Sequence, residues 1–482
     1  MKQTGDEYFD SNDFHQLLST YETSINAGEP VFMDADDLVD IADYYQYTGK
    51  KEEAEEAITM ALSLSPSAIS PLTYRIHEAL YEGNTKRAWD FLNQIIDTEE
   101  PDYIYDKAEI MIAEGHIDEA DDYLRQQLSK QDSYEQQDFI VDVANIFTEN
   151  GQPEKAMQWM TMAHQENSSD FKELMARTLF GLGKYRDSEK LFRELIDTDP
   201  FSKNYWNALA SAQYMNEDYQ NSIQSSEYAI AIDPNNPDGL LAKANGLYRL
   251  ENFEEALKYY QRYSEQIPDD EFALLYQGTC LLCLDKVDEA VGILQKALYV
   301  APKDSPYISD ICQELAFAFS EQKEFDKAIE ILNKTDDADC DHIHIHVIKG
   351  HVLLAAERLE EAEKMFHQAI SMSDDPRQTL LRVIVSFYDN KYLQAAYKLF
   401  KNYFAYYGNN HEGTPLTEGY AYMALCCYDL QYHDEFLENL QKACEINPEE
   451  CQQVLSHLFP KEMKPEEYYN YIKDKLQRNN KE

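Results

Sequence analysis

Prolines in the middle of this chain recur at a constant interval of 34 residues, at Pro200, Pro234, Pro268 and Pro302. Pro66 and Pro448 close similar segments nearer the two ends. A regular period of this length is the sequence signature of a repeat architecture. The 482-residue chain is therefore expected to form one array of repeats, and not the roughly three globular domains that length alone would predict.

Segments aligned on these prolines share residue classes at fixed positions. Small residues recur at positions 8, 20 and 27 of each unit, as Ala42, Ala54 and Ala61 do in the first unit. Large residues recur at positions 4, 11 and 24, for example Leu38 and Tyr45. The apolar spacing within each half is i, i+3, i+4, i+7, which marks one face of an α-helix. A short polar turn such as TGKKEE joins the halves, and proline stops the second helix. Each unit is thus predicted to be a helix hairpin.

This combination of period and residue classes resembles the tetratricopeptide repeat, a helix pair of 34 residues. The resemblance covers residues 35–450 and implies an all-α protein, an α-solenoid in which hairpins stack into a right-handed superhelix. Residues 1–34 are expected to form an N-terminal capping helix or partial repeat, and residues 451–482 to form C-terminal capping helices. About twelve units are predicted, starting near residues 35, 69, 101, 137, 169, 203, 237, 271, 309, 343, 376 and 417.

Three units depart from the pattern. Ile76 and Val383 replace the small residue at position 8, and Phe436 replaces the alanine at position 20, so local packing is expected to differ there. The step to the last unit is longer than the others, which predicts an inserted loop or hinge at residues 406–415.

The chain is strongly acidic, with 42 basic and 90 acidic residues and a formal net charge of -48. Nucleic acid and anionic membranes are not expected partners, because both require basic residues. The acidity keeps an exposed solenoid soluble and monomeric, or it attracts partners with basic segments. The sequence shows no secretory leader and no membrane-spanning run, and its eight cysteines all lie at or beyond Cys280. A disulfide framework would staple the whole chain, so a cytoplasmic location is expected.

Candidate chemistry is sparse. Cys280 and Cys283 fall within a predicted helix and are expected to be two buried thiols, not a redox pair. His342 and His346 have the i, i+4 spacing of zinc ligands, and Cys340 lies nearby. This segment is expected to straddle a loop boundary, so no metal and no cofactor is predicted. Phosphate-binding loops, nucleophile elbows and metalloprotease motifs are absent from the sequence. A non-enzyme is expected.

The inner face of the solenoid is the predicted binding surface. In the family that the chain resembles, the first helix of each pair lines this concave wall at positions 2, 5, 9, 12 and 13. Asparagine can both donate to and accept from a peptide backbone, and aromatic rings supply contact area. The alternative is that these residues form ordinary solvated helix faces. The residues selected in the central units are Arg177, Phe180, Asn204, Asn207, Tyr214, Asn245, Tyr248, Arg249, Phe272 and Leu275.

Two functions remain open at this point. The first is a protein–protein interaction scaffold that binds a peptide or protein segment in the concave groove. The second is a structural subunit that is built into a larger assembly through its convex face or ends. The set of basic and asparagine residues with which some family members clamp chaperone C-termini is not found in this sequence, so a co-chaperone role is not predicted.

Overall fold

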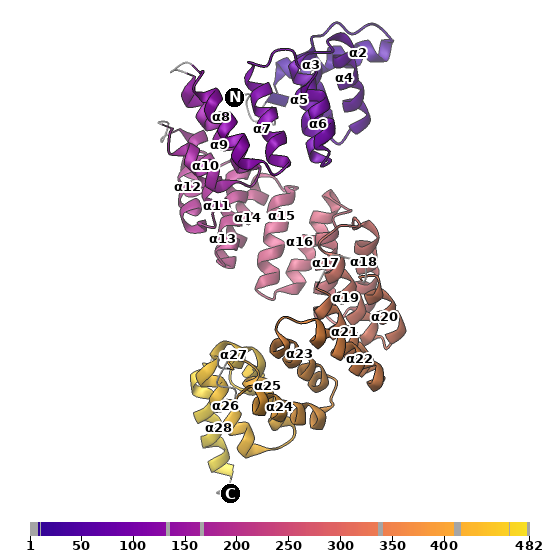
Figure 1. The fold of residues 1–482 in the computed structure, drawn as a ribbon, viewed down its shortest axis with the longest axis vertical. Helices are drawn as coiled ribbons and strands as arrows, with labels where there is room; N and C mark the ends of the chain where they lie inside the picture. The colour runs from indigo at the N-terminus through magenta and orange to yellow at the C-terminus, as the bar shows by residue number, and fades with distance from the viewer. Residues whose placement is uncertain are drawn as a thin grey trace. The chain divides into compact units, whose positions relative to one another are not determined.

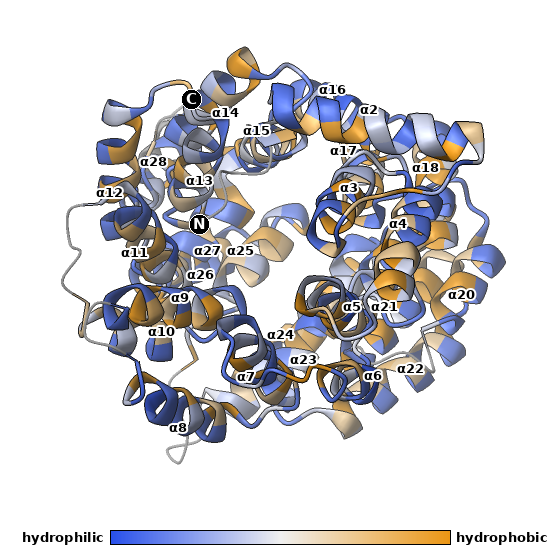
Figure 2. Ribbon diagram, turned by 90° about the horizontal axis from the view of Figure 1, so that it is seen from above, coloured by the Kyte–Doolittle hydropathy of each residue, from blue (hydrophilic) through white to orange (hydrophobic). Residues whose placement is uncertain are grey.

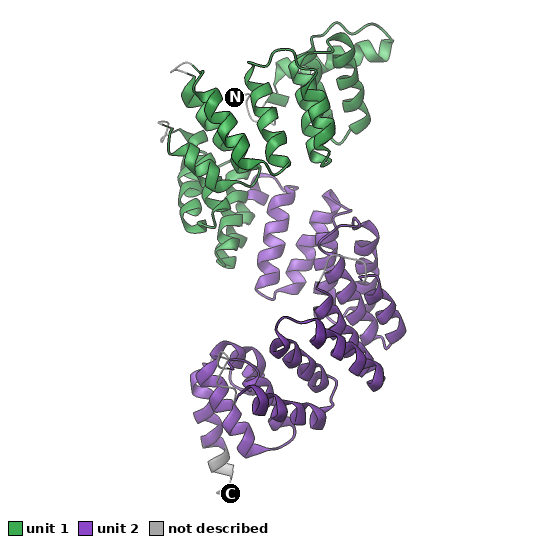
Figure 3. Cartoon of the chain, viewed as in Figure 1, with its two compact units in different colours: residues 1–228 green, residues 229–482 purple. Residues whose placement is uncertain are grey.

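The computed structural model describes residues 8–9, 11–131, 135–163, 168–335, 341–408, 416–461 and 463–479. Every regular element within these ranges is a helix, as Figure 1 shows. The chain is an all-α solenoid built from helix hairpins, which confirms the predicted fold class. It divides into two compact units, residues 1–228 and residues 229–482, which are coloured in Figure 3 and are described separately.

Unit 1 begins with a single helix, which is followed by consecutive hairpins. The last helix, α14, contains the boundary between the units. The helices are α2 (Asn12–Ala27), α3 (Ala35–Tyr47), α4 (Lys51–Leu64), α5 (Ile69–Tyr81), α6 (Thr85–Leu92), α7 (Pro101–Ala113), α8 (Ile117–Leu128), α9 (Gln136–Glu149), α10 (Pro153–Met160), α11 (Ser169–Gly181), α12 (Tyr185–Thr198), α13 (Lys203–Met215) and α14 (Tyr219–Ile232).

Unit 2 continues with hairpins and ends in shorter helical segments. Its elements are α15 (Pro237–Arg249), α16 (Phe253–Gln266), α17 (Glu271–Cys283), α18 (Val287–Val300), α19 (Ile308–Glu321), α20 (Phe325–Asn333), α21 (His342–Ala355), α22 (Leu359–Met372), α23 (Pro376–Asp389), α24 (Leu393–Tyr407), α25 (Tyr420–Asp429), α26 (His433–Ile446), α27 (Pro448–Leu455), η1 (Ser456–Leu458) and α28 (Pro465–Asn479).

Local sequence explains where these helices begin and end. Each proline of the 34-residue series lies two residues beyond the end of a helix, as Pro268 does after α16. Proline lacks the N–H that would continue the helix, so the predicted stop is confirmed. At the start of α17 the Asp270 side chain accepts hydrogen bonds from the backbone N–H groups of Phe272 and Ala273. Such caps satisfy N–H groups that the first helical turn leaves without partners.

The core of each unit lies between the paired helices. Most helices carry both apolar and polar residues, visible as mixed colours in Figure 2, and bury the apolar side. At position 8, Gly278 lies against Leu294, and Gly350 lies against the ring of Phe366. A small residue on the first helix therefore makes room for a large residue on the second, as the repeat pattern predicts.

The unit that has Ile76 in place of a small residue is packed differently. Ile76 is fully buried beside Leu72, Ala88 and Leu92. Its neighbour Arg75 is only 6% exposed and binds Glu55 of α4 through two contacts of 2.6 Å.

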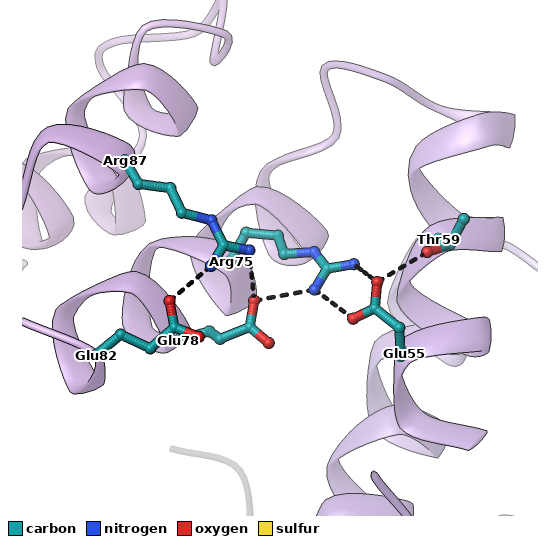
Figure 4. A network of polar contacts seen from close by, with 6 residues as sticks. All are labelled: Glu55, Thr59, Arg75, Glu78, Glu82 and Arg87. Carbon is teal, nitrogen blue, oxygen red and sulfur yellow. Dashed lines mark hydrogen bonds and ion pairs between the residues drawn. The ribbon is translucent and has the colours of Figure 1, made fainter. Parts of the chain in front are cut away.

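The same guanidinium binds Glu78, which also accepts a bond from Arg87 of α6. Figure 4 shows this network joining α4, α5 and α6. Arg75 lowers the pKa of the Glu55 carboxyl by hydrogen bonding to it. The other two exceptions, Val383 and Phe436, are also buried, at 4% and 2% exposure.

Both ends of the array carry additional helical packing. In unit 1, Phe14, Leu18 and Tyr21 of α2 share a core with residues of α3 and α4. In unit 2, Phe459 stacks on Tyr468 of α28 with ring centroids 3.7 Å apart. These contacts cover apolar faces that the first and last hairpins would otherwise expose. Most of the predicted insertion, residues 409–415, lies outside the described residues.

Candidate binding grooves

The predicted groove residues fall on both units, and within unit 1 two of them meet at one cavity. Arg177 and Phe180 of α11 line a 380 Å³ cavity. Arg177 is held by Asn145, at 3.4 Å from Nη1, and by Glu149, at 3.5 Å from Nη2. The ring of Phe180 meets the edge of Tyr185 at 5.4 Å. The guanidinium is thus already oriented by groups on the neighbouring helix.

The three predicted residues of α13 do not line that cavity. Asn204 is exposed, whereas Asn207 is buried, with 8% exposure. Tyr214 is half-buried and meets Tyr219 edge to face at 5.4 Å. Their role in binding stays a prediction.

In unit 2 the predicted aromatic residues belong to one cluster. Tyr248 and Phe272 both contact Tyr276, with ring centroids 4.9 and 4.6 Å apart, and Phe272 also contacts Tyr307 at 5.3 Å. Burial raises the pKa of Tyr248 to about 12. Asn245 accepts a 2.7 Å hydrogen bond from the Tyr260 hydroxyl.

Two further residues complete the predicted set in unit 2. Arg249 is exposed, and Leu275 is buried, with 4% exposure. The structure therefore brings together the aromatic residues of this set, through Tyr276, which the sequence positions did not select.

A larger cavity in unit 2 was missed by the sequence analysis. It has a volume of about 580 Å³ and is lined by α19, α21, α23, α25 and the segment around α27. We call it the C-terminal groove. Its principal lining residues are Phe317, His344, Val347, Ile348, His351, Gln378, Leu381, Arg382, Val385, Asp389, Glu418, Tyr422 and Glu449.

The histidines of the C-terminal groove are neutral groups near neutral pH. Burial lowers the pKa of both His344 and His351. His344 Nε2 lies 2.9 Å from Gln313 Oε1, and the ring of His351 meets Phe317 edge to face. These residues occupy positions 2 and 9 of the unit that starts near 343. The positional rule used for the central units would have found them had it been extended along the chain.

A second missed cavity lies in unit 1, and we call it the N-terminal groove. It has a volume of about 710 Å³ and is lined by α3, α5 and the start of α7. Its lining is mostly polar and includes three acidic residues, the half-buried Tyr74, and Tyr81, which is 96% exposed. The lining residues are Val39, Asp43, Gln46, Ser70, Thr73, Tyr74, His77, Glu78, Tyr81 and Asp102.

The structure changes part of the sequence-based view of the cysteines. Cys280 is buried as expected, but Cys283 is exposed, so the prediction of two buried thiols is wrong for Cys283. Cys283 is the last residue of α17. Cys426 and Cys427 of α25 are both buried.

The histidine run lies at the start of a helix, within one residue of the predicted unit start at 343. His342 is the first residue of α21, and His346 lies one turn later. His346 Nδ1 donates to the His342 carbonyl oxygen at 2.6 Å, so this nitrogen is engaged by the backbone. Cys340 lies outside the described residues.

Three models of known protein families match parts of the chain. Two family models described as tetratricopeptide repeat match residues 174–237 and 38–67. A third, described as anaphase-promoting complex, cyclosome, subunit 3, matches residues 215–297. No curated protein matches the sequence. The repeat period, the helix hairpins and these matches make the chain a tetratricopeptide-repeat protein, and the fold of this class is that of a scaffold for protein–protein interaction.

Solved structures with similar helical folds are only distantly related. The Cut9–Hcn1 hetero-tetramer of the APC/C is 13% identical and covers 95% of each chain, with a TM-score of 0.35. YrrB, a TPR protein with an unusual peptide-binding site, is 16% identical over 39% of this chain and 95% of its own, with a TM-score of 0.34. Pseudomonas aeruginosa PilF is 17% identical over 42% of this chain and 89% of its own, with a TM-score of 0.36. These scores are too low to establish a shared overall arrangement.

Among the described residues, no helix is both long enough and apolar enough to cross a bilayer.

Proposed function

We propose that the chain is a non-catalytic scaffold that binds an extended segment of a partner protein in the C-terminal groove. The observation that carries this proposal is a cavity of about 580 Å³ that successive first helices line with apolar side chains. Ligand pockets commonly have volumes of about 300–1,000 Å³ and an apolar lining with a few polar groups. The groove has a volume in this range, and its apolar residues are mixed with a larger number of polar and charged residues.

The lining suggests the chemistry of the bound segment. Phe317, Val385 and Tyr422 are half-buried and offer apolar contact area. The exposed guanidinium of Arg382 can donate hydrogen bonds to backbone carbonyl groups. Glu418 and Glu449 are exposed acids at the same groove and favour a basic residue in the ligand. We therefore expect a peptide that combines apolar residues with lysine or arginine.

The proposal also includes the oligomeric state, the partner charge and the location expected from the sequence. The protein is proposed to be a monomer that favours partners with basic segments, and to lie in the cytoplasm. The selected residues of the central helices remain candidate contacts within their own units. Short-range recognition through asparagine and aromatic residues would add to the long-range attraction of the acidic chain.

Mutation of the groove tests the proposal. Val385→Glu places a charge among the apolar residues of the groove. Arg382→Glu reverses the charge at that position and replaces a hydrogen-bond donor with an acceptor. Against an array of peptides with mixed apolar and basic residues, each variant is expected to lose at least ten-fold in affinity, or about 1.4 kcal/mol. Lys398→Glu, an exposed residue of α24 outside the groove, is the matched control and should bind as the unaltered protein does. Unchanged binding by both groove variants would contradict the proposal.

A second candidate function is a permanent subunit of a larger assembly. It is favoured by the match of residues 215–297 to the family model of an anaphase-promoting complex subunit. A protein of this kind would be stable only together with a co-purifying subunit. Light scattering on the purified chain, together with its yield with and without captured partners, separates this function from peptide binding.

A further inference from the structure

Three side chains from neighbouring hairpins of unit 1 meet at one point. His77 projects from α5, and Asp106 and Glu109 project from adjacent turns of α7. His77 Nε2 lies 3.1 Å from Asp106 Oδ1 and 3.1 Å from Glu109 Oε2. One donor atom from each residue lies within 4.8 Å of the others. An imidazole nitrogen and two carboxylate oxygens are thus brought together by residues far apart in the sequence.

The spacing of these atoms suits a shared metal ion. Zinc binds imidazole nitrogen and carboxylate oxygen at about 2.0–2.2 Å, so two of its ligands lie roughly 3.0 Å apart at right angles and about 3.4 Å apart in a tetrahedron. Both contacts of His77 fall within that interval. The donor oxygens of Asp106 and Glu109 lie within 4.8 Å of each other. Glu109 is the more exposed of the two carboxylates, at 16% against 2%, so its side chain has the greater freedom to approach an ion.

A hydrogen bond explains this arrangement less completely. His77 Nε2 carries at most one proton, and one N–H cannot point directly at two carboxylates that are equally distant from it. A metal ion at this position would contact all three donor atoms at once. Protonated His77 is the competing explanation, since hydrogen bonds to Asp106 and Glu109 raise its pKa to about 10.

The surroundings of the cluster favour a cation. Asp106 is 2% exposed. Its second oxygen accepts a 2.7 Å hydrogen bond from the Thr73 hydroxyl, which fixes the orientation of the carboxylate. Supporting bonds of this kind are typical of the residues around a metal site. Among the described residues, no lysine or arginine forms an ion pair with Asp106 or Glu109.

We propose that His77, Asp106 and Glu109 bind a divalent transition-metal ion, and that Zn²⁺ suits this ligand set best. One nitrogen and two carboxylate oxygens form the mixed ligand set that zinc accepts. Three protein ligands leave at least one coordination position for water or for a partner's side chain. Because His77 also lines the N-terminal groove, the ion lies at the edge of that cavity. The site is independent of the C-terminal groove, which belongs to the other unit.

Zinc titration of the full chain tests the site. The protein is first treated with a chelator and then titrated with Zn²⁺ alone by isothermal titration calorimetry. One ion is expected to bind per chain at this site. His77→Gln and Glu109→Gln should each weaken that binding at least ten-fold, since loss of even a supporting residue commonly weakens metal binding about 10- to 100-fold.

Two controls separate this site from other histidines. His15→Gln alters an exposed histidine of α2 in the same unit and should leave zinc affinity unchanged. The double variant His342→Gln/His346→Gln removes the histidine run of α21 and should also retain the site. Circular dichroism checks that each variant folds. If His77→Gln does not fold, Glu109→Gln alone tests the loss of zinc binding.

Two results would overturn the proposal. One is that the unaltered chain binds no zinc at millimolar concentrations of the ion. The other is that His77→Gln and Glu109→Gln bind zinc as tightly as the unaltered chain, with or without a loss in the α21 double variant. Either result would leave the cluster as a proton-bridged contact between α5 and α7.

Discussion

The turns between paired helices differ between the first five hairpins and those that follow. In the first five, glycine occupies the turn residue with positive φ, at Gly49, Gly83, Gly115, Gly151 and Gly183. In the later hairpins the equivalent residues are not glycine but nevertheless have φ between 57° and 65°. They are Glu217, Glu251, Asp285, Lys323, Glu357, Lys391 and Gln431.

The hydrogen bonds of the two kinds of turn are the same. Gly115 donates to the Ile112 carbonyl at 2.9 Å, and the next residue, His116, donates to Met111 at 2.9 Å. Glu251 donates to Tyr248 at 2.9 Å, and the next residue donates to Leu247 at 2.9 Å. A left-handed residue that closes a helix in this way is usually glycine, because other residues are strained there by about 1–2 kcal/mol. The packing of the hairpin, and not the residue type, therefore imposes the backbone conformation in the later turns.

Glycine is used differently in the later hairpins, inside the first helix of the pair. A Cβ on Gly278 would lie 2.4 Å from Leu294, and a Cβ on Gly350 would lie 2.3 Å from the ring of Phe366. At the same position, the early hairpins have alanine at Ala108 and Ala144. The turns of the early hairpins thus use glycine for backbone conformation, whereas Gly278 and Gly350 of the later hairpins serve close packing.

The largest effect is expected from replacing all five turn glycines of the early hairpins with lysine. Strain of about 1–2 kcal/mol per residue, offset by about 0.4–1 kcal/mol of lost unfolded-state entropy, predicts a total loss of roughly 2.5–5 kcal/mol. The measurement is urea unfolding monitored by circular dichroism. A fivefold asparagine variant is the control and should lose less, because asparagine tolerates this conformation. Equal losses in the two variants would show that strain at these turns is not the reason for glycine.

A smaller loss is expected for Gly350→Ala. The new methyl group would overlap the buried ring of Phe366, and overpacking of a core commonly destabilises a protein by about 1–3 kcal/mol. Gly292→Ala on α18 is the matched control, since nothing lies within 4 Å of its added Cβ. This control should gain up to about 1 kcal/mol from better helix propensity. If both variants shift the urea midpoint in the same direction, close packing at Gly350 is not supported.

The later hairpins also contain a carboxyl group, that of Glu314, whose charged form is disfavoured by burial. Burial raises the pKa of Glu314 to about 7, above its value of 4.5 in an unstructured chain. The protonated carboxyl is therefore favoured by folding, and its stabilising contribution is lost as pH rises from about 4.5 through 7. Glu314→Gln should raise stability by up to about 3 kcal/mol above pH 7, since one pKa unit corresponds to about 1.4 kcal/mol, and should change little below pH 4. The measurement is thermal unfolding across this pH range, and a gain that does not vary with pH would contradict the assignment.

The smallest effect is expected at a single late turn. Glu251→Gly relieves the left-handed strain but increases the entropy of the unfolded chain, so a net gain of about 0.5–1 kcal/mol is expected. Glu254→Gly, three residues later in the first turn of α16, makes the same chemical change in a helical conformation. It should destabilise the protein by a similar amount. The opposite signs are the test, and a loss in both variants would mean that packing has removed the strain at Glu251.

Some residues of the candidate sites could be predicted from their positions in the repeat. Positions 2, 5 and 9 select His344, Val347 and His351 in the C-terminal groove when the rule is extended to their unit. The same rule selects His77 in the N-terminal groove. It does not select Tyr276, which joins Tyr248 to Phe272, because that contact depends on how neighbouring helices cross.

The sequence by itself determined the helices, their stops and their pairing into hairpins. These features depend on residues close together in the chain: apolar spacing, capping side chains and prolines, which act within a few residues of one another. The 34-residue period also determined that neighbouring hairpins stack, since no single hairpin can bury its apolar face alone.

Only the tertiary structure decided which side chains meet across neighbouring hairpins. His77 meets Asp106 and Glu109 because α5 and α7 lie side by side with a specific offset. The packing between these helices involves side chains from both, since Ile76 of α5 and Ile110 of α7 belong to one buried cluster. Contacts of this kind depend on shifts of an ångström or less, and a pattern of residue classes does not specify distances on that scale.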